Sequence, residues 1–192
     1  MQNPIRIGTR ASRLALWQAR DIARRLQEAH PDLAVTLIPM TTRGDQIQDR
    51  SLADIGGKGL FIKELESALL KGSVDMAVHS LKDVPAVLPS QLMIGAVTER
   101  EDPRDALISP HYKTLKNLPQ GAKVGTSSLR RRAQLLHIRS DLDIIPLRGN
   151  ITTRLRHADD GTCDAVILAA AGLKRLGFDN KITEYLPLSL CI

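Results

Sequence analysis

The clearest strand-to-helix transition in the chain is Lys123-Val-Gly-Thr-Ser-Ser-Leu-Arg-Arg-Arg132. Residues 122–125 predict a strand that ends at Gly125, and residues 128–138 predict a helix with apolar side chains at helical spacing. Strands that alternate with helices are typical of α/β domains with a largely parallel sheet. The sequence on both sides of this segment repeats the alternation, so it predicts the fold class.

The same alternation divides the chain into two series. Before residue 99 it predicts strands at 5–8, 35–38, 74–78 and 93–97, a helix that begins after Ser12 and ends before Pro31, and a helix at 60–70. After the charged, proline-containing break at 99–104 it predicts strands at 106–108, 122–125, 143–147 and 164–168, and helices at 128–138, 151–158 and 170–176. We expect two α/β domains, 1–98 and 99–192, with mixed, largely parallel sheets. In such folds ligands bind at the carboxyl ends of strands, and a cleft between two domains is the expected ligand site.

The composition favours an anionic partner. The 192 residues include 27 Lys+Arg and 21 Asp+Glu, so the formal charge is +6, and only 3% are aromatic. Few aromatic residues argue against single-strand nucleic acid binding by stacking, but duplex nucleic acid and small acidic ligands both remain open. The longest apolar run, 165–173, is too short to cross a bilayer. The N-terminus lacks the pattern of a secretory signal and the two cysteines form no disulfide framework, so we expect a cytoplasmic protein.

Arginines follow several predicted strands. Arg10 follows the first strand, Arg148 follows strand 143–147, and Arg154 lies about one turn into the next helix. Arginine binds carboxylates through a bidentate fork that lysine cannot form. We therefore expect a ligand that carries several carboxylates or phosphates.

A helix N-terminus with three arginines is a second candidate anion site. Thr126, Ser127 and Ser128 can cap helix 128–138 and donate hydrogen bonds to the same anion. Arginines 130–132 oppose the helix dipole in the first turn, so their charges need a compensating partner. A capped helix with a solvated basic face is the alternative.

The segment Val78-His79-Ser80-Leu81-Lys82-Asp83-Val84-Pro85 places an acid beside a base at a strand end, which is a plausible catalytic position. An ordinary turn with a surface ion pair explains the same spacing. The polar, glycine-bearing segment 41–59 predicts a long loop. Within it, Gly56-Gly57-Lys58-Gly59 fails the phosphate-loop pattern and favours a flexible hinge that places Lys58 at a cleft mouth. The histidines have no metal-ligand spacing, so no metal site is expected.

Eight motifs occur in order along the chain. They are Ala-Leu-Trp-Gln (15–18), Thr-Arg-Gly-Asp (42–45), Gly-Gly-Lys-Gly-Leu-Phe (56–61), Ala-Val-His-Ser-Leu-Lys-Asp-Val-Pro (77–85), Glu-Arg-Glu-Asp-Pro-Arg-Asp-Ala (99–106), Val-Gly-Thr-Ser-Ser-Leu-Arg-Arg (124–131), Leu-Arg-Gly-Asn (147–150) and Ala-Gly-Leu-Lys-Arg-Leu-Gly (171–177). Together they closely resemble the porphobilinogen deaminase, or hydroxymethylbilane synthase, family. This resemblance covers essentially the whole chain.

The resemblance implies a transferase of porphyrin and haem biosynthesis. Four porphobilinogen molecules would lose ammonia and join head to tail into a linear tetrapyrrole, on a dipyrromethane cofactor held by a cysteine thioether. Asp83 would be the catalytic residue and would stabilise the cationic azafulvene that forms when ammonia departs. Carboxylates of the pyrrole units would be bound by Arg10, Ser12, Lys58, Lys82, Thr126, Ser128, Arg130, Arg131, Arg148, Arg154 and Arg175. Lys58 would close over the cleft.

The chain departs from the family pattern in three respects. Arg13 and Asp54 replace residues that are common in the family, and no role is assigned to either. In the family the attachment cysteine lies in a third, C-terminal α+β domain. Neither Cys163 nor Cys191 matches its motif, so the resemblance leads us to expect that these 192 residues do not include that domain. We expect the same of the strand that the family returns to the first domain. The resemblance therefore implies the family chemistry, but not activity of this chain alone.

Two other functions remain as alternatives. Paired α/β domains of this kind resemble periplasmic solute-binding proteins, so the chain can be a non-catalytic polycarboxylate-binding protein with that fold. Nucleic-acid binding driven by the positive charge is the other alternative. Under the first hypothesis we expect a monomer that binds porphobilinogen and neither nucleic acid nor a membrane.

Overall fold

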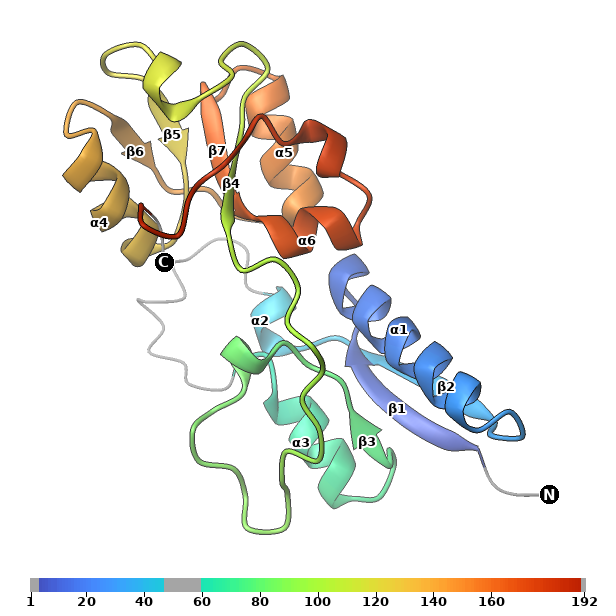
Figure 1. Ribbon diagram of the computed structural model, residues 1–192. Coiled ribbons are helices and arrows are strands. Elements are labelled where there is room, and N and C mark those ends of the chain that lie inside the picture. The colour runs from blue at the N-terminus through green and yellow to red at the C-terminus, as the bar shows by residue number, and fades with distance from the viewer. Residues whose placement is uncertain (1–3, 47–59, 191–192) are drawn as a thin grey trace. The chain divides into compact units, whose positions relative to one another are not determined.

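The computed structural model describes residues 4–46 and 60–190, which form two compact units, 1–98 and 99–192 (Figure 1). Each unit contains one β-sheet with helices packed against it. The α/β class and the mixed, largely parallel sheets that the sequence predicts are confirmed. Each unit is described by itself below.

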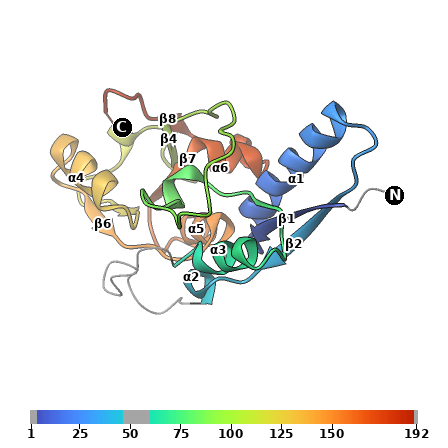
Figure 2. The same cartoon turned by 90° about the horizontal axis from the view of Figure 1, so that it is seen from below.

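Unit 1 contains a three-stranded parallel sheet in the order β2-β1-β3. Its elements in chain order are β1 (Ile5–Arg10), α1 (Arg13–Ala29), β2 (Val35–Met40), α2 (Arg43–Gln46), α3 (Lys63–Leu70), β3 (Met76–Ala77) and the 3-10 turn η1 (Leu81–Asp83). Figure 2 shows α1 lying along β1 and β2. Because the strands are parallel, β1 and β3 both end at the edge of the sheet where η1 and the start of α1 lie.

Local signals set the ends of α1. The Ser12 side chain accepts a hydrogen bond from the Ala15 amide at 3.4 Å, and the helix ends one residue before His30, which Pro31 follows. On its inner face Ala19 is fully buried, and the strand side of the core contains Ile7. The predicted helix between Ser12 and Pro31 is therefore confirmed.

Two predictions for unit 1 are wrong. Residues 93–97 form no strand: Met93 is 82% exposed and Val97 68%, and no described strand lies beside them. Residues with high strand propensity stabilise a strand by packing against a sheet surface. A segment of such residues therefore forms no strand when no neighbouring strand pairs with it. The segment 41–59 was predicted as loop throughout, but α2 begins within it at Arg43. The remainder of that segment, 47–59, lies outside the described residues.

Other elements are shorter than predicted. The regular part of β3 is two residues long, although backbone hydrogen bonds from Asp75 to Arg6 (2.9 Å) and from Val78 to Gly8 (3.0 Å) continue the pairing on both sides. In unit 2 the predicted strand 143–147 ends at Ile145. The next residue is Pro146, which has no N–H to donate to a neighbouring strand.

Unit 2 contains a five-stranded mixed sheet in the order β6-β5-β7-β4-β8. Its strands are β4 (Asp105–Ile108), β5 (Lys123–Gly125), β6 (Asp143–Ile145), β7 (Ala165–Ala169) and β8 (Glu184–Tyr185). Strand β5 pairs in parallel with β6 and β7, and β4 pairs antiparallel with β7 and β8. The helices are α4 (Leu129–Ile138), α5 (Ile151–Asp159) and α6 (Ala170–Arg175), with short 3-10 turns η2 (Leu115–Asn117) and η3 (Asp179–Lys181).

The sheet of unit 2 is covered on both faces (Figure 1). Successive residues of a strand face opposite sides, so Leu107 and Ile167 join the cluster that contains Leu135 of α4. Ala106 and Val166 join the opposite cluster, with α5 and α6. This explains why residues 106–108 of β4 and all of β7 are apolar.

Candidate active site

A small pocket in unit 1 brings together four of the predicted site residues: Arg10, Ser12, Lys82 and Asp83. Its volume is about 150 Å³. It lies where β1 and β3 end, as expected for a ligand site in a parallel sheet. Its lining is completed by Leu14, Ala15, Gln18, Val78, His79 and Ser80.

Hydrogen bonds to neighbouring elements fix the turn that carries Asp83. The Asp83 amide donates to the Ser80 carbonyl at 2.9 Å and closes η1. The Ser80 hydroxyl donates to Gln18 Oε1 of α1 at 3.1 Å, and His79 Nε2 lies 3.0 Å from the Phe61 carbonyl oxygen. Asp83 itself is half-buried. The turn thus holds a carboxylate at the pocket and fits both the catalytic hypothesis and the turn alternative.

The pocket's arginine is engaged by a carboxylate of its own unit. Arg10 Nε donates to Asp45 Oδ2 at 3.2 Å, and Arg10 Nη2 forms a short contact with Asp45 Oδ1. Burial raises the pKa of Asp45, but hydrogen bonds from Arg10 and Thr42 outweigh burial and leave the pKa below its usual value. Sequence reasoning gave Asp45 no role, because a contact between residues this far apart leaves no local signal.

In unit 2 the hydroxyl residues after β5 act as helix caps. Ser128 Oγ accepts from the Arg131 amide at 3.3 Å, and Thr126 Oγ1 accepts from the Ser128 amide at 3.2 Å. Gly125 is needed before them, because a Cβ at this position would lie 2.1 Å from Leu147 Cδ1. The capped-helix alternative therefore describes the Thr126 and Ser128 hydroxyls.

Asp105 compensates the arginines at the start of α4. It accepts from Arg131 Nε at 2.8 Å and from Arg131 Nη2 at 2.6 Å, and Arg130 Nη2 lies 3.4 Å away. The Asp105 side chain is 5% exposed and that of Arg131 13%. Arg131 Nη1 also donates to the Ile167 carbonyl at 3.3 Å. The compensating partner that the helix dipole requires is thus internal, and no local sequence pattern indicates it.

A group of arginines with net positive charge lies beside α4. Arg154 Nε donates to the Gly149 carbonyl at 2.9 Å, and Gly149 has a φ of +94°, which favours glycine. Burial lowers the pKa of Arg154, and the positive charges of Arg131 and Arg148 lower it further. No acidic side chain of the described residues forms an ion pair with Arg148 or Arg154. We call Arg148 and Arg154 the arginine pair; an anion bound there would relieve the repulsion.

The remaining residues singled out in the sequence lie outside both sites. Arg175 ends α6 and is half-buried. Cys163 is 2% exposed in the core, and burial, followed by Asp160 and Asp164, raises the pKa of its thiol to about 11. Lys58, Asp54 and Cys191 lie outside the described residues.

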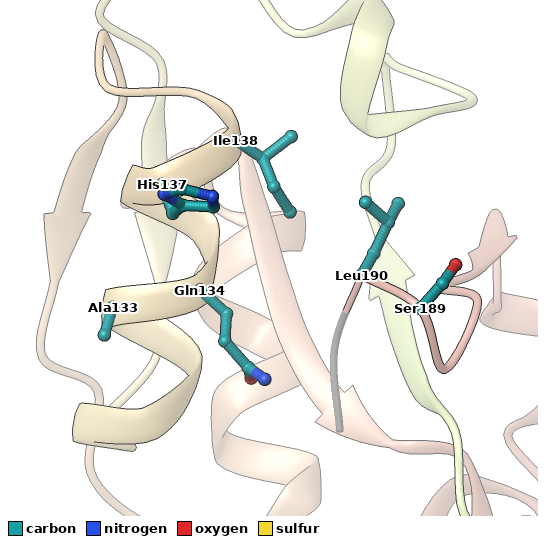
Figure 3. A pocket seen from close by; sticks show the side chains of 6 residues that line it. All are labelled: Ala133, Gln134, His137, Ile138, Ser189 and Leu190. Carbon is teal, nitrogen blue, oxygen red and sulfur yellow. The ribbon is translucent and has the colours of Figure 1, made fainter.

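A larger hollow of about 630 Å³ lies between α4 and the segment after β8 (Figure 3). It carries none of the predicted site residues, so size alone does not identify the site. Its lining consists of Ala133, Gln134, His137, Ile138, Ser189 and Leu190. Within residues 4–46 and 60–190, no three His, Cys, Asp or Glu side chains are arranged to hold a metal ion, and no helix is long and apolar enough to span a membrane.

Comparison with known proteins gives a consistent result. The profile of the family described as "Porphobilinogen deaminase, dipyromethane cofactor binding domain" matches residues 5–192. The chain is 57% identical over 188 residues to the porphobilinogen deaminase of Syntrophotalea carbinolica, covering 98% of this chain and 60% of that protein. It is 56% identical over 190 residues to that of Geobacter sulfurreducens, covering 99% of this chain and 59% of that protein. The chain thus spans about 60% of the length of these relatives.

Among solved structures, a periplasmic substrate-binding protein of an ABC transporter from Coxiella burnetii matches with a TM-score of 0.52 and 16% identity. The match covers 95% of this chain and 79% of that one. At this identity the likeness concerns the fold alone, and it confirms the periplasmic-binding-protein-like architecture.

Proposed function

The chain belongs to the porphobilinogen deaminase family, and from this membership we propose that it takes part in condensing four porphobilinogen molecules into hydroxymethylbilane with release of ammonia. The chain spans about 60% of its relatives, so the activity of the whole protein enters here as a proposal. We further propose a cytoplasmic monomer that uses neither nucleic acid nor a membrane as partner.

The single observation that carries this proposal is the shared pocket of Asp83, Arg10, Lys82 and Ser12. Porphobilinogen has two carboxylates and a protonated aminomethyl group. The guanidinium and the ammonium complement its carboxylates, while the Asp83 carboxylate complements the cationic end. When the C–N bond breaks, ammonia departs with the bonding electrons and the pyrrole becomes a cationic azafulvene. A fixed carboxylate beside it lowers the energy of the developing charge.

The arginine pair supports a second part of the proposal, namely that unit 2 holds carboxylates of a dipyrromethane cofactor and of the growing chain. When bound, that cofactor supplies the pyrrole end to which new units are added. The donor set fits it, because the half-buried Arg154 lies among positive charges and pyrrole acetates and propionates would neutralise them. The buried Cys163 thiol is a poor candidate for attachment, since its raised pKa disfavours the nucleophilic thiolate.

Incubation of the chain with porphobilinogen tests the proposal, with ammonia release and the intact mass of the protein as readouts. Asp83→Asn should lower ammonia release at least tenfold, equivalent to about 1.4 kcal/mol of barrier, and leave porphobilinogen binding nearly unchanged. Asp75→Asn is the matched control, because Asp75 pairs with Arg6 at the other end of β1 and β3. A smaller effect of Asp83→Asn removes the catalytic role, and tight binding without ammonia release in the unsubstituted chain favours the polycarboxylate-binding alternative.

A further inference from the structure

The guanidinium of Arg10 is held on two sides within unit 1. Asp45 forms a fork with its Nε and Nη2 atoms, and the Phe61 ring centroid lies 4.2 Å from the central guanidinium carbon. Both charged side chains are largely buried, with 19% of Arg10 and 21% of Asp45 exposed. Long side chains on a surface lose such contacts easily, so this geometry needs support from neighbouring residues.

Thr42 provides the support for Asp45. The fully buried Thr42 donates to Asp45 Oδ2 through its hydroxyl at 2.7 Å and through its amide at 3.3 Å. These bonds and the Arg10 fork together satisfy both oxygens of the carboxylate. The orientation of Asp45, and through it that of Arg10, is therefore set by the backbone at the start of α2.

Gly44 provides the support for Phe61. A Cβ at position 44 would lie 2.2 Å from the Phe61 ring, so only glycine lets the ring lie against this turn. The Gly44 amide also donates to the Leu60 carbonyl at 2.9 Å, which ties the two segments together. The motif at 42–45 is thereby explained in part: threonine orients the carboxylate, glycine admits the ring, and aspartate forms the fork.

The fork leaves part of the guanidinium available. Arginine has five N–H donors in one plane, and the Asp45 fork engages Nε and Nη2, so Nη1 lies outside it. Arg10 also lines the pocket of Asp83. A guanidinium that is already ordered loses less conformational freedom when a ligand carboxylate binds to its remaining edge.

We propose that Asp45 is a positioning residue that fixes Arg10 for a carboxylate of the substrate in the pocket of Asp83. This inference rests on the proposed function for the identity of the ligand. Asp45 acts through Arg10 and does not itself touch the substrate, and Thr42 acts one step further back.

Calorimetric titration of the chain with porphobilinogen tests the inference. Asp45→Asn should raise the Kd at least tenfold at unchanged stoichiometry, because every folded molecule keeps its pocket but holds Arg10 poorly. A merely structural role would instead lower the fraction of binding-competent molecules at unchanged Kd. Asp75→Asn, which breaks the fork on Arg6 on the same strand, should leave the Kd within twofold.

Two milder variants keep the test decisive if Asp45→Asn folds poorly. Thr42→Val removes the hydroxyl that orients Asp45 and should raise the Kd about threefold. Thr42→Ser keeps a hydroxyl and should leave the Kd close to that of the unsubstituted chain. The Arg10 Nε–H signal in a nitrogen-15 NMR spectrum, protected from exchange in the unsubstituted chain, should broaden or vanish in Asp45→Asn and persist in Asp75→Asn. This last readout needs no ligand and no turnover.

The outcomes separate the inference from the proposed function. A Kd for Asp45→Asn within twofold of the unsubstituted chain, or below it because Asp45 competes with the ligand for Arg10, overturns the positioning role. Intact porphobilinogen binding without ammonia release in the unsubstituted chain would overturn the catalytic proposal alone. An unprotected Arg10 signal in the unsubstituted chain would overturn the fork itself.

Discussion

Replacing Asp105 by asparagine removes one charge from the buried ion pair that holds Arg131 at the start of α4. The carboxylate accepts two hydrogen bonds from that guanidinium, at 2.8 and 2.6 Å, and its side chain is 5% exposed. Asparagine keeps one acceptor oxygen but turns an amide N–H₂ towards guanidinium donors. The result is a largely buried cation with half of its fork unsatisfied, next to Arg154, whose pKa is already lowered by positive charge.

Removing one partner of a buried ion pair costs about 3–5 kcal/mol. Because one acceptor remains, we expect the lower end, about 3 kcal/mol of unfolding free energy. For a denaturant slope of about 2 kcal/mol per molar urea, this shifts the urea midpoint down by about 1.5 M. Asp159→Asn is the control: its partner Lys181 is 42% exposed and Asp159 49%, so that ion pair is worth at most about 1 kcal/mol.

Urea unfolding followed by circular dichroism measures both variants, and hydrogen exchange of peptides from β4 and α4 localises the loss. A third variant, Asp105→Asn with Arg131→Met, should recover most of the stability, because it removes the unpaired buried charge. If Asp105→Asn lowers the unfolding free energy no more than Asp159→Asn does, the ion pair does not stabilise unit 2 in the way described. The same follows if the double variant is as unstable as Asp105→Asn.

Three further predictions concern packing and protonation. Gly125→Ala should cost about 1–3 kcal/mol, because its Cβ would lie 2.1 Å from Leu147 Cδ1; an unchanged melting temperature would contradict this packing. Cys163, with a pKa raised to about 11 by burial, should resist iodoacetamide at pH 8 in the folded chain and react in urea, as peptide mass spectrometry can show. Since the folded pKa exceeds the unfolded value of 9.0, its contribution to stability should be full below pH 9 and lost towards pH 11, which a comparison with Cys163→Ala would detect. Arg6 lowers the pKa of Asp75 from 3.8 to about 2, so the stability from this ion pair is present above pH 3.8 and lost as the pH falls towards 2; an NMR titration midpoint near 4 would refute it.

The sequence predicted well the features that depend on neighbouring residues. Ser12 and Pro31 bracket α1 as expected, and Ser128 caps α4, because caps and proline act within one helical turn. Residues 106–108 of β4 and most of β7 were predicted as strands, and both are apolar, as a sheet covered on both faces requires. The pocket residues Arg10 and Asp83 were anticipated as strand-end residues, since parallel strands bring their carboxyl ends to one edge.

Features that depend on distant partners were not predicted. Asp45 and Asp105 lie 35 and 26 positions from the arginines that they hold, and no periodicity records such contacts. The segment 93–97 has the composition of a strand, but no described strand lies beside it to pair with, so it forms no strand. In each case the missing information was the identity of the partner, which only the folded chain supplies.

The strand order of unit 2 also bears on how the protein folds while it is being made. Among the strands of unit 2, β4 leaves the ribosome first. Its two neighbours in the sheet, β7 and β8, are made much later, from residues 165–169 and 184–185. The three apolar residues of β4, Ala106, Leu107 and Ile108, are buried in the finished sheet, so during synthesis they stay exposed until the last part of the unit emerges. Nascent chains arrested before residue 165 should therefore leave this segment open to chaperones or to association with other chains, while the three described strands of unit 1 have already been made.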